Sequence, residues 1–181
     1  EKKRLFAQHN RTSTLKKGIG FAAFMHGAGF TGAGEKQLAS VVGVEATEEG
    51  KVRILSASTE IGQGTNTIFA QMAADALNIS LGCVEVAQPD TGTVPNSGPT
   101  VASRTCMIVG KLVESAALSL KHTLAPSGLL RADYSSEDFC EACAEYVRRR
   151  GPLKSLDQYE QPPEISWDEV AFQGDAYRDY A

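Results

Sequence analysis

The feature that most constrains this chain is a glycine-rich turn, residues 58–67, that lies between a strand pattern and a helix pattern. Residues 51–57 carry the alternation of a strand, and apolar residues then recur every three or four positions over residues 65–77, which predicts a helix. The turn therefore lies at a helix N-terminus, where unpaired backbone N–H groups and the helix dipole favour a phosphate, an oxo group or a polarised carbonyl. Gly62 and Gly64 allow the backbone to approach a ligand or adopt positive φ, and Gln63 offers one acceptor and two donors.

A second polar, turn-rich stretch covers residues 90–103, between the next strand pattern, residues 84–87, and the next helix pattern. Thr100, Ser103 and Thr105 place three hydroxyl groups in the expected first turns of that helix, where they can cap it or reach a ligand. The alternative is that the glycines only make tight strand-to-helix turns. Two such stretches, each before a helix, favour a binding site.

The sequence Glu60-Ile61-Gly62-Gln63-Gly64 is followed by VPNSGPTVAS at residues 94–103. The two motifs, in this order, resemble the molybdenum-cofactor-binding part of the xanthine dehydrogenase/aldehyde oxidase family, and the similarity runs from about Lys17 to Leu120 and resumes at residues 172–177. It implies that the Gln63 amide and the Ile61 backbone contact the cofactor, that the three hydroxyls hold its pterin and phosphate end, and that residues 101–102 lie near the metal. The implied cofactor-binding residues are Ile61, Gly62, Gln63, Gly64, Thr100, Val101, Ala102, Ser103 and Thr105.

The resemblance also implies an activity for a longer protein, in which molybdopterin supplies the difficult chemistry. Such an enzyme hydroxylates a heteroaromatic, purine-like or aldehyde carbon with oxygen from water and passes electrons to 2Fe-2S and FAD centres in other domains or subunits. The family's catalytic Glu would lie beyond residue 181 and further motifs before Glu1, so we expect an inactive fragment that holds one wall of the site. The alternative function is a non-catalytic scaffold or interaction domain whose glycine-rich turns only shape loops.

Length and composition limit the classes of protein that fit. With 181 residues, 42% of them hydrophobic, the chain can bury one core. A net charge of −4 argues against a nucleic-acid or anionic-membrane surface, so any phosphate must be held locally. No run of eighteen apolar residues is present, and four cysteines in a chain with an ample core favour free thiols and a reducing cytoplasm.

The order of patterns predicts an α+β domain with two layers, a mixed sheet in β-β-α-β-α order and helices packed on one face. The hairpin comprises residues 38–46 and 52–57, and the third strand is parallel to it or one strand away. The first strand of this hairpin extends over residues 37–47 at its outer bounds. The remaining expected elements are a strand over residues 18–26 before a glycine-dense loop over 27–34, a helix over 100–124, and a helix over 137–149 capped by Ser136. We expect one partial cofactor-binding domain over residues 1–181, with a core over about 17–124 and a helical insert and loop-rich tail over 125–181.

Three further positions offer candidate chemistry. Cys140 and Cys143 form a CxxC motif, but no second ligand pair accompanies it, so core or half-buried thiols are favoured over a metal site. His26, at the end of the expected strand, is either a site residue or a simple hydrogen-bonding group. Glu60 is either a general base or an acceptor for backbone N–H groups.

Overall fold

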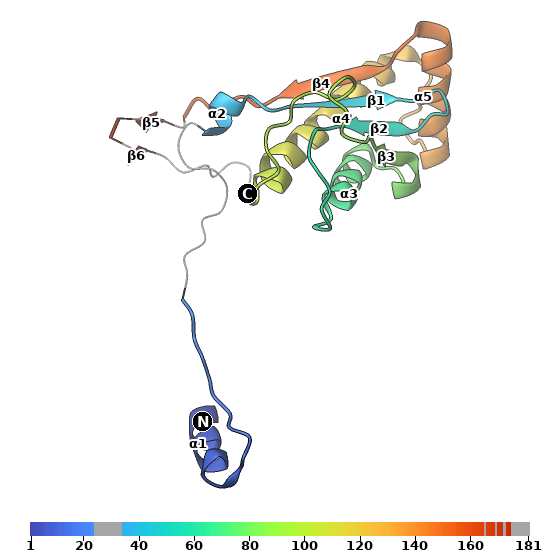
Figure 1. Cartoon of the computed structure of the whole chain (residues 1–181). Helices are drawn as coiled ribbons and strands as arrows, with labels where there is room; N and C mark the ends of the chain where they lie inside the picture. The colour runs from blue at the N-terminus through green and yellow to red at the C-terminus, as the bar shows by residue number, and fades with distance from the viewer. Residues whose placement is uncertain (24–33, 165, 169, 172, 175–181) are drawn as a thin grey trace.

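The centre of the protein is a mixed four-stranded sheet in the order β3-β2-β1-β4 (Figure 1). This computed structural model describes residues 1–23, 34–164, 166–168, 170–171 and 173–174. Strand β1 (Val41–Ala46) pairs antiparallel with both β2 (Val52–Leu55) and β4 (Lys154–Gln158), and β3 (Val84–Val86) pairs parallel with β2. The predicted hairpin and the parallel third strand are confirmed.

Helices α3 (Thr65–Leu77) and α4 (Gly110–Leu124) pack side by side on one face of this sheet (Figure 1). The face that α4 and the turn before it bury against the strands is an apolar stripe. Its residues are Ile108, Leu112, Val113, Ala116, Ala117 and Leu120. Helix α5 (Ser136–Arg150) lies at one end of the sheet and contacts α4 and β1. The α+β class with two layers is therefore confirmed.

Shorter elements complete the described structure. They are α1 (Lys2–Thr12), α2 (Gly34–Leu38), the 3-10 turns η1 (Leu81–Cys83) and η3 (Ala125–Ser127), the π-helical turn η2 (Thr105–Val109), and the paired strands β5 (Trp167–Asp168) and β6 (Gln173–Gly174). None of the described helices combines the length and apolar character that crossing a membrane requires.

Several predicted boundaries are wrong at the N-terminal side. Helix α1 was not predicted, and residues 18–23 of the expected strand have no regular structure. The last residues of that strand lie outside the described part, as does the glycine-dense loop expected over 27–34 except for Gly34, which begins α2. The strand expected over residues 37–47 begins only at Val41, because α2 continues to Leu38 and Ala39 then takes a positive φ of 44°. A residue at positive φ fits neither helix nor strand geometry, because both need negative φ.

The second half contains three corrections. The helix expected from Thr100 begins at residues 104–105, because Ala102 has a positive φ of 47° and the chain around it forms a turn. Ser135, and not Ser136, caps α5: its hydroxyl accepts from the Asp138 N–H at 3.1 Å while the Asp138 carboxylate accepts from the Ser135 N–H at 2.8 Å. Strand β4 was missed, since its sequence KSLDQ is mostly polar and it occupies a sheet edge.

Candidate functional site

The two predicted binding stretches lie against each other in the fold. The Thr59 N–H donates to Thr100 Oγ1 at 2.8 Å, and the Ala57 N–H donates to Ser97 Oγ at 3.0 Å. Each bond joins residues about forty positions apart in the sequence, so they fix the second loop beside the first. The two loops are therefore in direct contact.

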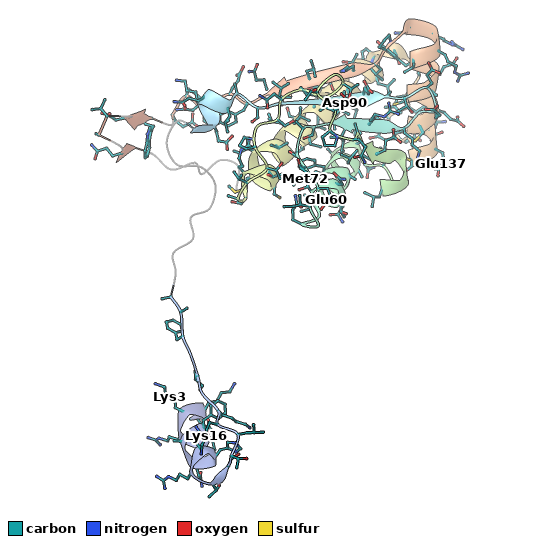
Figure 2. The ribbon with its side chains drawn as sticks, viewed as in Figure 1. Lys3, Lys16, Glu60, Met72, Asp90 and Glu137 are labelled. Carbon is teal, nitrogen blue, oxygen red and sulfur yellow. The ribbon has the colours of Figure 1, made fainter. Side chains whose placement is uncertain are left out.

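Glu60 organises the glycine-rich turn at the start of α3, where Figure 2 places it beyond the sheet on the α3 side. Its Oε1 accepts from the Gly62 N–H at 2.6 Å and the Gly64 N–H at 3.1 Å, and its Oε2 accepts from the Asn66 N–H at 3.1 Å. The bonds from Gly64 and Asn66 hold the pKa of Glu60 below its ordinary value. Of the two roles weighed for Glu60, this geometry favours the acceptor of backbone N–H groups, and it fills part of the anion site expected at this helix terminus.

The Gln63 side chain is also used within its own turn. Its Nε2 donates to the Thr59 carbonyl at 2.8 Å and to Thr65 Oγ1 at 2.7 Å, and its Oε1 accepts from the Ile61 N–H at 2.7 Å. Two predicted cofactor contacts, the Gln63 amide and the Ile61 backbone, are thus bonded to each other. A carboxamide oxygen can accept a second bond, so Oε1 remains available to a donor on a ligand.

A hollow of about 160 Å³ lies between the start of α3 and η2. It brings together three of the predicted site residues, Gln63, Ala102 and Thr105, and it is completed by Thr65, Ile68, Phe69 and Cys106. The Cys106 thiol is exposed. Two apolar site residues, Ile61 at 79% and Val101 at 44%, are also exposed, so each loop presents an apolar side chain at the surface.

Three buried hydroxyl groups around these loops have no hydrogen-bond partner among the described residues: Ser58 Oγ, Ser103 Oγ and Thr105 Oγ1. A buried hydroxyl without a partner costs about 1–3 kcal/mol. Two of the three, those of Ser103 and Thr105, belong to the set of hydroxyls that the family resemblance implies for the pterin and phosphate end. The third predicted hydroxyl, on Thr100, accepts the bond from Thr59 instead.

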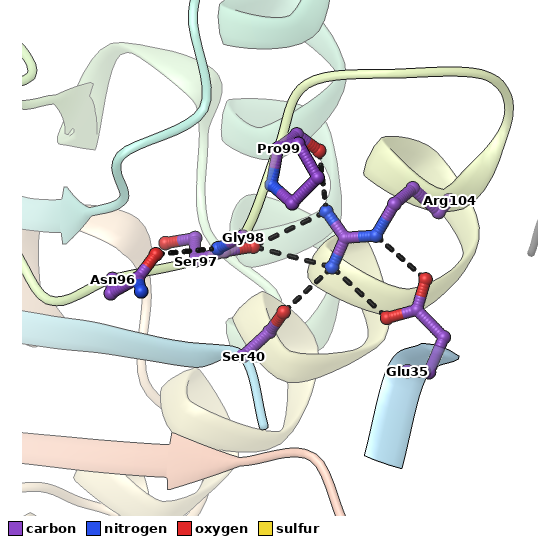
Figure 3. Close-up of polar contacts among 7 residues, drawn as sticks. All are labelled: Glu35, Ser40, Asn96, Ser97, Gly98, Pro99 and Arg104. Carbon is purple, nitrogen blue, oxygen red and sulfur yellow. Dashed lines mark hydrogen bonds and ion pairs between the residues drawn. The ribbon is translucent and has the colours of Figure 1, made fainter. Parts of the chain in front are cut away.

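Sequence reasoning missed a buried ion pair beneath the second loop (Figure 3). Arg104 and Glu35 are 0% and 1% exposed, and the guanidinium is paired with both carboxylate oxygens, Nε to Oε1 at 2.6 Å and Nη2 to Oε2 at 3.1 Å. The only sequence signal was an arginine inside a run of small and hydroxyl-bearing residues, residues 100–106. Nothing local points to its partner, which lies 69 positions earlier in the chain.

The cysteine motif lies on α5, away from the two loops. Cys143 is buried and Cys140 half-buried, as predicted, and burial raises the pKa of each thiol to about 12. Within the described ranges, no three His, Cys, Asp or Glu side chains form a group that could hold a metal ion. His26 lies outside the described residues.

A family model described as the molybdopterin cofactor-binding domain matches residues 1–180. The chain belongs to this family. Xanthine dehydrogenase 2 of Arabidopsis thaliana is 31% identical over 175 residues, which cover 97% of this chain and 12% of that protein. Aldehyde oxidase 2 of Macaca fascicularis is 30% identical over 130 residues, or 72% of this chain and 10% of that protein. The resemblance drawn from the two loop motifs is confirmed, and both relatives are oxidoreductases by name.

The molybdopterin cofactor-binding domain fold also matches solved structures. Aldehyde oxidoreductase from Desulfovibrio gigas aligns with a TM-score of 0.57 at 21% identity, covering 75% of this chain and 14% of that one. At this identity the likeness concerns the fold. Because the chain spans about an eighth of the plant relative's length, the reaction of a whole enzyme is a matter for proposal.

Proposed function

We propose that this chain forms one wall of the molybdopterin site in a longer molybdenum hydroxylase of the xanthine dehydrogenase type. The observation that carries the proposal is the pair of buried hydroxyls on Ser103 and Thr105 that lack a partner, on a loop bonded to the glycine-rich turn. Polar groups buried in a folded protein are almost always paired. A ligand rich in hydrogen-bonding groups, such as a pterin with its phosphate, supplies the missing partners.

The residues present fit this cofactor. Thr105 and Ser103 provide hydroxyls that both donate and accept, Gln63 Oε1 retains an acceptor site, and the exposed Ile61 and Val101 provide an apolar rim. The positive φ of Ala102 turns the backbone between Val101 and Ser103, and we place the metal end of the cofactor beside this turn. When bound, the cofactor supplies the molybdenum centre at which a carbon is hydroxylated with oxygen from water.

The rest of the proposed enzyme lies in other segments or subunits. We assign the substrate-activating base, the 2Fe-2S and FAD centres and the other walls of the cofactor site to them, and a heteroaromatic or aldehyde compound as substrate. The proposal is supported by the names of the relatives, which include xanthine dehydrogenases and aldehyde oxidases. The isolated 181-residue chain should therefore show no hydroxylase activity.

The test uses Thr105→Val, because valine preserves the shape of threonine and removes only the hydroxyl. In the isolated chain this change removes a buried unpaired group and should raise stability, by about 1–3 kcal/mol. In the full-length enzyme the same change removes a cofactor contact and should weaken cofactor binding by roughly 5- to 150-fold. The measurements are urea unfolding of the isolated chain and molybdenum content per folded full-length protein.

Thr123→Val is the matched control, since Thr123 lies on α4 and its hydroxyl already donates to the Ser119 carbonyl at 3.1 Å. It should leave the molybdenum content unchanged. Full molybdenum content in a Ser103→Ala/Thr105→Val double variant would show that these loops are not the cofactor wall. A full-length protein without molybdenum or pterin would support the scaffold alternative.

A further inference from the structure

We propose that the buried Arg104–Glu35 pair is a positioning device for the cofactor wall, holding the loop over residues 97–103 in its binding shape. This inference rests on the proposed function and assigns to it two residues that do not touch the ligand. Arg104 lies directly between Ser103 and Thr105, whose hydroxyls lack partners, and its own side chain is fully buried in the protein. Fixing this side chain fixes the backbone that carries both hydroxyls.

The guanidinium binds the loop at several points (Figure 3). Nη1 donates to the Pro99 carbonyl at 2.7 Å and to the Ser97 carbonyl at 3.3 Å, while Nη2 donates to Ser40 Oγ at 2.6 Å. With Nε and Nη2 on Glu35, the planar fork joins α2, the entry to β1 and the second loop. A lysine ammonium has three donors on one atom and cannot reproduce this geometry.

The same loop carries this constraint to the glycine-rich turn. Ser97, fully buried, donates its hydroxyl to the Val41 carbonyl at 2.9 Å and accepts from the Ala57 N–H at 3.0 Å. The Asn96 carbonyl accepts from the Val41 N–H at 2.9 Å. The guanidinium on one side and β1 on the other therefore hold residues 96–99, and Thr100 then receives the bond from Thr59.

A role in shape, beyond stability, follows from the energetics of such pairs. Removing two charges from water offsets most of their attraction, so a buried ion pair contributes little net stability compared with apolar side chains of similar volume. The two parallel hydrogen bonds between the guanidinium and the carboxylate do, however, strongly restrict the orientation of the two side chains. Arg104 lies where that restriction matters, one residue from each of Ser103 and Thr105, whose hydroxyls have no partner among the described residues.

The test compares Arg104→Lys and Glu35→Gln with a matched control, Arg53→Lys. Arg53 donates from Nε to Glu85 Oε1 at 2.6 Å, the same distance as in the Arg104 pair, but it lies on β2 and is 41% exposed. In the full-length enzyme, Arg104→Lys and Glu35→Gln should release molybdopterin about tenfold faster than the parent, with a matching fall in molybdenum content. Arg53→Lys should change neither quantity.

A second measurement on the isolated chain separates loop position from general unfolding. Cys106 borders the hollow beside Thr105, so its alkylation rate by iodoacetamide reports the shape of the loop. This rate should change in Arg104→Lys and Glu35→Gln at temperatures where circular dichroism shows a folded protein, and stay constant in Arg53→Lys.

The outcomes distinguish this inference from the proposed function. If Thr105→Val loses cofactor while Arg104→Lys and Glu35→Gln match the Arg53→Lys control in cofactor release and Cys106 alkylation, the wall is correct and the positioning role is wrong. If the Ser103→Ala/Thr105→Val variant keeps its cofactor, the wall assignment fails, and the positioning role fails with it. If the Ser103 and Thr105 variants and the Arg104 and Glu35 variants all lose cofactor, and the Cys106 alkylation rate changes in the Arg104 and Glu35 variants, both the wall assignment and the positioning role are supported.

Discussion

Gly98 provides a direct test of how tightly the second loop packs on the Arg104–Glu35 pair. The residue has a φ of +75°, and a Cβ built on it would lie 2.8 Å from Ser40 Oγ and 3.0 Å from Arg104 Nη2. Gly98→Ala should therefore strain the backbone and also force Ser40 and Arg104 apart. Gly128 is a matched control, because its φ is +78° and a Cβ there meets nothing within 4 Å.

The magnitude follows from these two contributions. Placing an L-residue in the left-handed region costs about 1–2 kcal/mol, and Gly128→Ala should show this cost alone. Gly98→Ala should add the loss of the 2.6 Å hydrogen bond from Arg104 to Ser40, about 1.5–3 kcal/mol for a bond to a charged group. At about 2–4 °C per kcal/mol for a chain of this size, Gly98→Ala should melt roughly 3–12 °C below Gly128→Ala.

Thermal unfolding of the two single variants and the parent chain by circular dichroism measures the difference. Equal melting temperatures for Gly98→Ala and Gly128→Ala would refute the reasoning, since they would show that the contact with the guanidinium has no energetic consequence. Ser40→Ala should cost less in the Gly98→Ala background than in the parent, because that background has already lost the hydrogen bond from Arg104 to Ser40.

Three further predictions concern the thiols, a helix cap and acid sensitivity. Near neutral pH, iodoacetamide should alkylate the exposed Cys106 well before Cys140 and Cys143, whose pKa values burial raises to about 12; equal rates by mass spectrometry would contradict the burial. Ser135→Ala removes the hydroxyl acceptor at the start of α5 and should cost about 1 kcal/mol in urea unfolding, and an unchanged midpoint would argue against the cap. The pKa of Glu60 is lower in the folded chain than in the unfolded chain. Its contribution to the stability of the folded turn is therefore complete above the unfolded-state pKa, and it is lost as the pH falls through the folded-state pKa. The turn amides should thus lose hydrogen-exchange protection in acid, and Glu60→Gln should abolish that pH dependence; a variant with the parent's acid response would exclude Glu60 as the cause.

The sequence predicted those parts of the fold that depend on local patterns. Helix α3 has the predicted bounds, Thr65–Leu77, because it is bounded by Gly64 and Asn78, both in the left-handed conformation, and its apolar period is unbroken. The hairpin was equally readable, since the turn before Lys51 contains a glycine at φ +86° between two apolar strands. Both features need only neighbouring residues to be recognised.

Features that depend on distant partners could not be predicted in this way. Strand β4 takes its place through pairing with β1, and its Leu156 is 59% exposed, so no buried alternation marks it. Glu35 of α2 is buried because Arg104 is its partner. No pattern within residues 34–38 reveals this burial. The two loop motifs identified the cofactor-binding region, but the internal bonding of Gln63 and Glu60 depends on three-dimensional turn geometry.

The distribution of charge determines what kind of recognition this wall can provide. The backbone donors Gly62, Gly64 and Asn66 at the start of α3 are taken by the Glu60 carboxylate, and the cation nearest to Ser103 and Thr105 in sequence, Arg104, is neutralised by Glu35. A site whose charges are already balanced cannot bind an anion mainly by Coulomb attraction. The remaining groups are neutral hydroxyls, one carboxamide oxygen and the apolar side chains at its rim, which recognise shape and hydrogen-bonding pattern. This wall therefore suits the pterin and polar edges of the cofactor, and we propose that other segments of the enzyme neutralise the phosphate charge.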